Sequence, residues 1–249
     1  MARNPKIEHI KTKVRTRGDI REVGTKYLFR LYPIVHHMHE VLRLHAKDND
    51  SIQTSIHQYI ISLASHLETF FRDIFRYSIE YSEIFCDRII KAHRLRLPAD
   101  DDLAQQGIAR YDFIAETMTL QSLGSIANVF DLLFLPEGFR AAVENTQCIY
   151  GVPSRSAVTR GFPILAFPNW WQDFTQIFEL RHELVHDANS TLYIDRQLIA
   201  KLESLAVIMP QYVVLMINAN HFSMPYHNDT VPTIFLVEDF LAKDWCIVY

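Results

Sequence analysis

The sequence predicts an all-α fold, a helical bundle of about five to seven helices with a basic N-terminal extension. Several long segments repeat apolar residues at the 3.6-residue spacing of an amphipathic helix. Glycine is scarce, with 7 of 249 residues, whereas folds rich in tight turns or phosphate-binding loops use more. Hydrophobic residues form 49% of the chain and charged residues 22%, a composition typical of a globular protein with a full core.

The first elements are expected to be two helices that end near residue 81. A helix is expected within residues 20–46, interrupted near Pro33 because proline removes a backbone donor. The clearest helix spans residues 51–81, where Ile52, Ile56 and Leu63 share one face. The residues just before it, 48–51, offer side-chain caps for its first turn.

The second half of the chain is expected to alternate helices with two loops and an ambiguous end. Proline, glycine and aspartate predict loops at residues 98–102 and 150–168. The C-terminal residues 231–249 are compatible with a strand or a short helix. Helices are predicted over 111–134, 137–145, 170–188 and 195–219, with Pro210 bending the last of them.

Charge is unevenly distributed and suggests three regions. Residues 1–30 hold nine basic and three acidic side chains, so their net charge is +6 and the remainder of the chain carries −10. We expect a basic N-terminal extension with a helix over 1–46, a helical domain over 47–220 and a C-terminal extension over 221–249. The basic arm is either a solvated N-terminus or a contact to nucleic-acid phosphates. The phosphate contacts would be made by Lys11, Lys13, Arg15 and Arg17.

Cysteine usage and hydropathy indicate a cytoplasmic protein without membrane contact. Cys86, Cys148 and Cys246 are far apart and form neither a CxxC pair nor a disulfide framework. The N-terminus lacks the apolar core of a signal peptide. The longest apolar run, residues 205–217, is shorter than the ~20 residues that a membrane span needs. It is therefore expected to be a buried core helix.

The segment that carries chemistry is residues 169–189, NWWQDFTQIFELRHELVHDAN. At 100° per residue, Arg181 lies in the middle of an apolar stripe. A guanidinium at such a position has to be paired or to line a cleft, because an unpaired buried charge is costly. His182 and His186 are one turn apart at the edge of the stripe. The apolar members of the stripe are Phe174, Ile177, Phe178, Leu184, Val185 and Ala188.

One interpretation of this segment is a zinc site. His182-Glu183-Leu184-Val185-His186 has the HExxH spacing, in which two imidazoles bind zinc and the glutamate activates water. Glu203 would be the third ligand. Two features weigh against it: Asp187 places a charge directly after the second histidine, and a proline-rich loop precedes the helix where a substrate-binding strand is needed.

The other interpretation is an Arg-x-x-x-x-His motif, which runs from Arg181 to His186. With the segment Ser65-His66-Leu67-Glu68-Thr69-Phe70 on the first long helix, it resembles the HEPN family (higher eukaryotes and prokaryotes nucleotide-binding). The resemblance covers roughly residues 50–220. At the second motif position this chain has His182, where the family more often has asparagine or aspartate.

The resemblance implies a metal-independent endoribonuclease that needs no cofactor, of the toxin or antiphage kind. The ribose 2′-OH of RNA attacks the adjacent phosphorus, with His186 as acid or base and Arg181 stabilising the transition state. His182 would orient these groups, and Glu68 would pair with Arg181. HEPN proteins usually form homodimers, and many are inactive dimerisation or binding modules, which remains the alternative. The sequence identifies no antitoxin or regulatory partner.

Five further side chains have weaker assignments. Arg155 and Arg160 form a basic loop ahead of the motif helix and are candidate RNA phosphate contacts. Arg72, one turn past Glu68, is expected to be a surface ion-pair partner. Trp170 and Trp171 are expected to pack in the core or in a dimer interface rather than to stack on a base.

Overall fold

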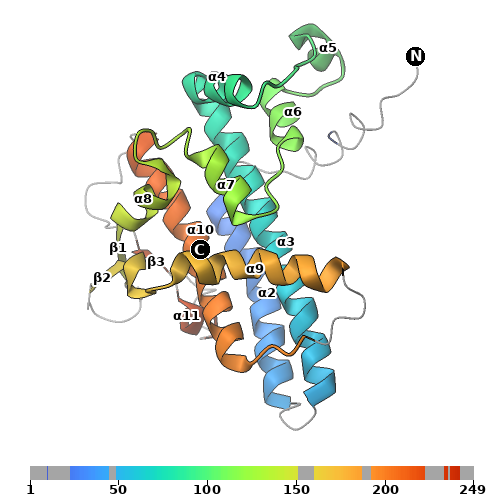
Figure 1. The fold of residues 1–249 in the computed structure, drawn as a ribbon, viewed down its shortest axis with the longest axis vertical. Helices are drawn as coiled ribbons and strands as arrows, with labels where there is room; N and C mark the ends of the chain where they lie inside the picture. Colours follow the sequence, from blue (N-terminus) through green and yellow to red (C-terminus); the bar gives the residue numbers. More distant parts are fainter. Residues whose placement is uncertain are drawn as a thin grey trace.

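The structure is a computed structural model that describes residues 10, 23–44, 49–150, 160–186, 192–221, 233–234 and 236–241. The described residues are mainly helical, which confirms the predicted all-α class (Figure 1). The predicted number of about five to seven helices is too low, because these residues form ten α-helices, several of them short. The helices are α2 (Val23–Leu44), α3 (Asn49–Tyr81), α4 (Glu83–Ala92), α5 (Asp100–Gln105), α6 (Arg110–Thr117), α7 (Leu123–Phe130), α8 (Gly138–Asn145), α9 (Trp170–His186), α10 (Arg196–His221) and α11 (Val237–Leu241).

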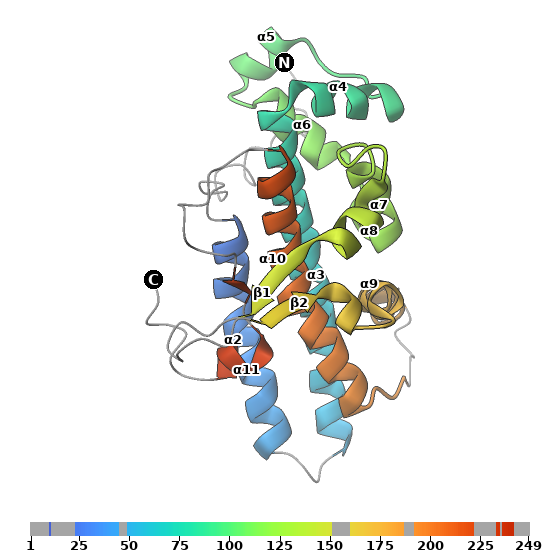
Figure 2. The same ribbon diagram turned by 90° about the vertical axis from the view of Figure 1, so that its left-hand side faces the viewer.

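Three long helices, α2, α3 and α10, run alongside one another, and α9 crosses them (Figure 1). α4, α5 and α6 gather at one end of α3, as both views show (Figure 2). The helices predicted over 51–81, 137–145, 170–188 and 195–219 correspond to α3, α8, α9 and α10. Pro210 lies inside α10 as predicted.

Pro33 does not interrupt α2, contrary to the sequence prediction. The proline costs one backbone hydrogen bond. Leu31 and Val35, on either side of it, are fully buried. Their packing stabilises the helix on both sides of the missing bond, because most helical stability in proteins comes from a buried apolar face.

The single helix predicted over 111–134 is wrong. The segment divides into α6 and α7, and the chain leaves the helix after Thr117. Ser122 then starts α7 with a reciprocal cap: its side chain accepts from the Ser125 backbone amide, and the Ser125 side chain accepts from the Ser122 amide. This capping box begins a new helix and separates α7 from α6.

The predicted loop at 98–102 is also partly wrong, because α5 begins at Asp100. Three aspartates lie in the first turn of α5, where their negative charges interact favourably with the helix dipole and stabilise the helix.

A small three-stranded sheet replaces part of the loop predicted at 150–168. β1 (Gln147–Tyr150) pairs antiparallel with β2 (Arg160–Pro163) and parallel with β3 (Thr233–Ile234). The short 3₁₀ helix η2 (Ile164–Ala166) leads from β2 towards α9. The ambiguous C-terminal segment contains both structures that the sequence allowed, because α11 follows β3. Figure 2 shows β1 and β2 beside α10.

One hydrophobic core joins α2, α3, α9 and α10. Phe71 on α3 is fully buried and its ring lies about 6 Å from those of Phe130, Phe139 and Phe174. The contacts with Phe130 and Phe139 are edge to face and that with Phe174 is tilted, and such aromatic contacts add to the energy of burial. α2 contributes Tyr27, Leu28, Leu31, Val35 and Met38 to the same core.

The expected boundaries near residues 46 and 220 do not separate packing units. α2, assigned to the N-terminal extension, packs along α3 as part of the main core. Ile10 is fully buried against Leu103, Ile108 and Phe113 in a second, smaller cluster. At the other end, Val237 on α11 joins the main core. Both extensions therefore include residues that stabilise the helical domain.

α10 is long and apolar enough to span a membrane by length and composition. In this structure 67% of its apolar window is buried by the rest of the fold. Residues from Leu205 to Val213 are all buried. The expectation of a buried core helix over 205–217 is thus confirmed.

Candidate active site

Arg181 on α9 and Glu68 on α3 form the contact that defines the site. Their Nη1 and Oε1 atoms lie 3.6 Å apart, and the side chains are 21% and 12% exposed. α9 packs across α3 through Phe174, which meets Phe71 one turn from Glu68. The predicted pairing of Glu68 with Arg181 is therefore present.

This ion pair is close but not hydrogen-bonded, since 3.6 Å exceeds the range for a nitrogen–oxygen hydrogen bond. Glu68 Oε1 and Arg181 Nε are buried and have no hydrogen-bond partner within the described ranges. Burial raises the pKa of the Glu68 carboxyl, and the positive charges of Arg181 and Arg72 oppose that rise. The site thus contains a buried carboxylate oxygen and a buried guanidinium nitrogen whose hydrogen-bonding capacity is not used within the described residues.

Arg72 belongs to the same cluster, which the sequence did not indicate. It was expected on the surface, but its side chain is only 19% exposed. Its Nε lies 4.0 Å from Glu116 on α6 and is likewise buried without a hydrogen-bond partner in the described part of the chain. The four-residue spacing predicts that Glu68 and Arg72 lie on one face of the helix. The sequence does not indicate that α6 covers this face and buries Arg72.

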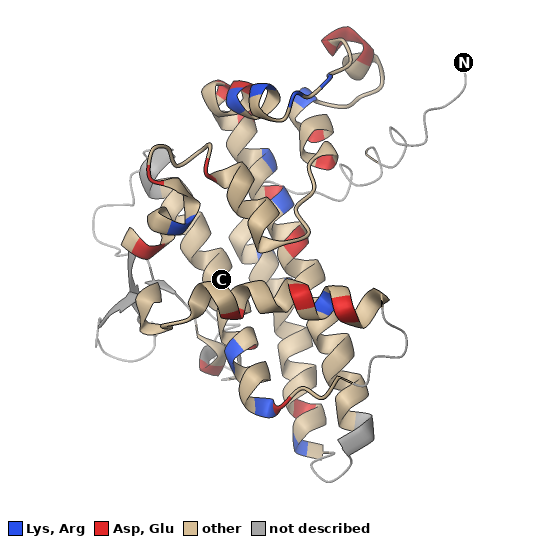
Figure 3. Ribbon diagram, viewed as in Figure 1, with Lys and Arg blue, Asp and Glu red and all other residues tan. Residues whose placement is uncertain are grey.

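His182 and His186 lie on the exposed last turns of α9. Their ring centroids are 4.5 Å apart, with planes inclined at 52°. Both side chains are exposed, whereas Arg181 is half-buried. Figure 3 shows acidic and basic residues alternating along this half of α9, where Glu179, Arg181 and Glu183 stand. The two imidazoles are therefore accessible to solvent on the same helix as the half-buried Arg181, whose contact in this structure is with Glu68.

The apolar stripe of α9 is buried only over its first half. Phe174, Ile177 and Phe178 are buried as predicted, but Val185 is 47% exposed. Leu184 is half-buried, and Ala188 lies outside the described residues. The expectation that Arg181 lies in the middle of a buried stripe is thus corrected: it lies where the stripe leaves the core.

The zinc interpretation loses its proposed third ligand. Glu203 on α10 is 2% exposed, and its carboxylate oxygens are bonded to His39 at 2.8 Å and to the Tyr59 hydroxyl. Both oxygens are therefore engaged with α2 and α3 rather than with His182 and His186. Among the residues that the structure describes, no three histidines, cysteines or carboxylates are placed to hold a metal ion.

The remaining predicted residues lie partly outside the described structure. Lys11, Lys13, Arg15, Arg17 and Arg155 fall outside the described residues. Arg160 is the first residue of β2, in register with Tyr150, so it is placed on a strand and not in a loop.

Trp170 packs in the core as expected, whereas Trp171 is only half-buried. Trp170 is 2% exposed, and its indole donates to Glu144 at 3.3 Å. Its ring meets that of Trp171 edge to face. Base stacking by Trp170 is thereby precluded in this conformation.

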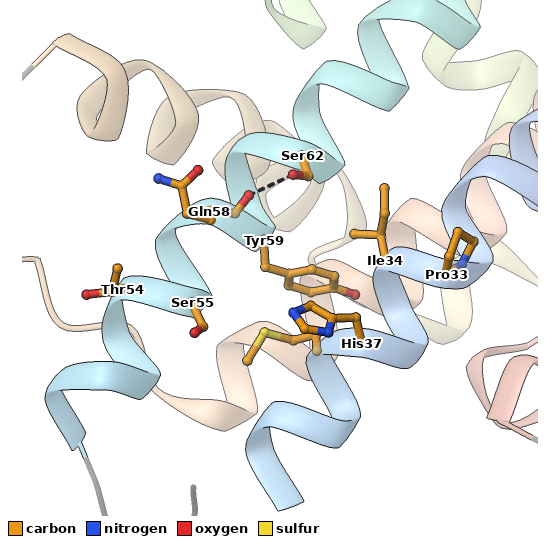
Figure 4. A pocket seen from close by; sticks show the side chains of 9 residues that line it. Pro33, Ile34, His37, Thr54, Ser55, Gln58, Tyr59 and Ser62 are labelled. Atoms are coloured by element: carbon orange, nitrogen blue, oxygen red, sulfur yellow. Dashed lines mark hydrogen bonds between the residues drawn. The ribbon is translucent and has the colours of Figure 1, made fainter. Parts of the chain in front are cut away.

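A separate groove of about 510 Å³ lies between α2 and α3. Figure 4 shows the ring of Tyr59 beside His37 in this groove. No predicted site residue lines it; its walls are formed by Pro33, Ile34, His37, Met38, Thr54, Ser55, Gln58, Tyr59 and Ser62.

Comparison of the chain with family models, with curated proteins and with solved structures found no significant match.

Proposed function

We propose that the chain is a metal-independent endoribonuclease of the HEPN type, with its active site on the C-terminal half of α9. The observation that carries the proposal is the half-buried Arg181, which lies beside Glu68 and on the same helix as the exposed imidazoles of His182 and His186. A positioned guanidinium stabilises the charge that develops on phosphorus, and a nearby imidazole transfers protons near neutral pH.

The chemistry follows from these groups. A base removes the proton of the ribose 2′-OH, and the oxygen attacks the adjacent phosphorus. The bond to the 5′-oxygen breaks, and that oxygen receives a proton from an acid, leaving a 2′,3′-cyclic phosphate and a 5′-hydroxyl. His186 supplies one of these proton transfers, Arg181 holds the phosphoryl oxygens with its forked donors, and His182 orients the group.

The test is cleavage of a mixed-sequence RNA by the purified full chain in EDTA. We expect cleavage to persist in EDTA and to fall about a hundredfold or more in His186→Ala, within the usual range for removing an acid–base group. His93→Ala, an exposed histidine that ends α4, is the matched control and should cleave normally. Loss of cleavage in EDTA would indicate a metal enzyme, and no cleavage by the unaltered protein would leave a binding module.

We propose that the enzyme acts as a homodimer, in which two copies of the motif line one cleft. Val185 on the last turn of α9 and Tyr193 just before α10 are 47% and 68% exposed. Contiguous exposed apolar patches mark contact surfaces, and we propose that these two side chains belong to one. Sedimentation analysis should show a dimer that Val185→Asp and Tyr193→Asp together dissociate; a monomeric unaltered protein would refute this assignment.

The basic arm remains a proposed RNA contact. Because Ile10 is buried, deleting the arm would also remove a core residue, so substitution is the cleaner test. Replacing Lys11, Lys13, Arg15 and Arg17 with serine should weaken RNA binding and reduce the dependence of affinity on salt. An unchanged salt dependence would show that the arm does not touch RNA.

We further propose a toxin or antiphage role in the cytoplasm. Inducible expression of the unaltered protein in bacteria should then arrest growth, and expression of His186→Ala should not.

A further inference from the structure

Two guanidinium groups from different helices face one carboxylate. Arg72 on α3 and Arg181 on α9 both interact electrostatically with Glu68. Arg72 is on the same helix as Glu68, one turn further along α3, whereas Arg181 is on α9. The cluster thus gathers two positive charges at the junction of α3, α6 and α9.

Neither guanidinium is saturated by its carboxylate. The Arg181–Glu68 distance is 3.6 Å and the Arg72–Glu116 distance is 4.0 Å. The Nε atoms of Arg72 and Arg181 are both buried and have no hydrogen-bond partner among the described residues. Each guanidinium therefore keeps a donor that its neighbouring carboxylate does not accept.

The exposure of the two arginines limits which acceptor can bind them. Their side chains are 19% and 21% exposed, so part of each reaches the surface although both Nε atoms are buried. Guanidinium groups match the oxygens of phosphate with paired, charge-assisted hydrogen bonds. Arg76, one turn further along α3, is already hydrogen-bonded to Asp112 and Glu80 and is not free for this role.

We propose that Arg72 joins Arg181 in binding a phosphodiester group of RNA at the junction of α3, α6 and α9. The inference rests on the proposed ribonuclease function and adds to it a second phosphate-binding arginine. Glu116 competes with the phosphate for Arg72, and Glu68 holds the pair in place when no nucleic acid is bound. Arg72 is a binding residue here, and no proton transfer is assigned to it.

The experiment measures the binding of a fully 2′-O-methylated RNA oligonucleotide by fluorescence anisotropy over a range of salt concentrations. This probe has no 2′-OH nucleophile, so binding is read without cleavage. Arg72→Ala in the full chain should bind about tenfold more weakly, the loss of roughly one charge-assisted contact, and its salt slope should be smaller by about one. Arg43→Ala removes an exposed arginine paired with Glu40 at the far end of α2 and should leave binding unchanged.

A second variant keeps the proposal testable if Arg72→Ala is unstable. Glu116→Gln removes the competing charge while conserving shape, and it should bind the oligonucleotide more tightly than the unaltered protein. Unchanged affinity in folded Arg72→Ala, or unchanged or weaker affinity in Glu116→Gln, would overturn the inference. Cleavage of unmodified RNA is measured separately. If the unaltered protein does not cleave RNA but Arg72→Ala weakens binding, only the proposed function is refuted. If the unaltered protein cleaves RNA but Arg72→Ala leaves binding unchanged, only this inference is refuted.

Discussion

Glu68 and Arg181 lie 3.6 Å apart, near enough to attract each other and too far apart to share a hydrogen bond. The carboxylate is therefore buried at a cost that its partner only partly offsets. Burial raises the pKa of Glu68, while Arg181 and Arg72 act in the opposite direction. The pair is better suited to positioning the partly exposed guanidinium than to stabilising the fold, because an imperfect buried ion pair contributes little stability.

The first prediction concerns the pH dependence that Glu68 confers on stability. A carboxyl whose pKa is raised by folding stabilises the native state while protonated, and that contribution is lost as pH rises through the raised pKa. Glu68→Gln does not show this loss of stability, because the amide of glutamine does not titrate. Chemical denaturation from about pH 4 to about pH 8 should show that the unaltered protein loses free energy of unfolding relative to Glu68→Gln as pH rises. The exposed Glu137→Gln is the control, and a constant difference between the unaltered protein and Glu68→Gln would contradict the prediction.

The second prediction concerns His39, whose ring bonds the buried carboxylate of Glu203 at 2.8 Å. That hydrogen bond raises the pKa of His39 above its ordinary value, against the opposing effect of burial. The stabilisation is complete below the unfolded pKa near 6.5 and is lost as pH rises through the folded value. The melting temperature should therefore fall with rising pH above neutrality more steeply in the unaltered protein than in His39→Gln.

His93→Gln provides the matched control for that measurement, since His93 is exposed at the end of α4. Its melting temperature should follow the unaltered protein at every pH. Parallel curves for His39→Gln and the unaltered protein would show that the contact with Glu203 does not titrate in this range.

Local sequence patterns predicted the long helices better than the contacts between them. The apolar period of residues 51–81 predicted α3. The apolar patterns of α3 and α9 placed Glu68 and Arg181 on helix faces that meet in the structure. Glu203 shows the limit of this reasoning. Its partners His39 and Tyr59 are 164 and 144 residues away in the chain, and periodicity indicates which face is buried without indicating which helix covers it. The break between α6 and α7 was missed because a serine at Ser125 closes the capping box where glutamate or glutamine is the usual signal.

The third prediction tests the core that positions α9 on α3. Phe71 is fully buried and its ring meets those of Phe130, Phe139 and Phe174. Phe71→Ala should reduce the free energy of unfolding by about 3–5 kcal/mol, the usual cost of such a truncation. Phe29→Ala, at a position 47% exposed, should cost far less. Equal losses in the two variants, measured by urea denaturation, would contradict the packing described for α3.

The last prediction compares two glycines at the starts of neighbouring helices. Gly138 begins α8 with a φ of +81°, and a Cβ there would lie 2.9 Å from Asp131 Oδ1. That oxygen accepts the Phe139 backbone amide at 2.7 Å, so it cannot move away without breaking a hydrogen bond at the start of the helix. Gly138→Ala should therefore cost about 1–3 kcal/mol of unfolding free energy.

Gly124, in the first turn of α7, has no atom closer than 4.0 Å to a built Cβ and no positive φ. Gly124→Ala should be neutral or should stabilise by about 0.4–1 kcal/mol, because alanine restricts the unfolded chain and favours the helix. Denaturant unfolding of both variants under one condition measures the difference. A Gly138→Ala protein as stable as Gly124→Ala would mean that the turn between Asp131 and Phe139 does not need its left-handed residue.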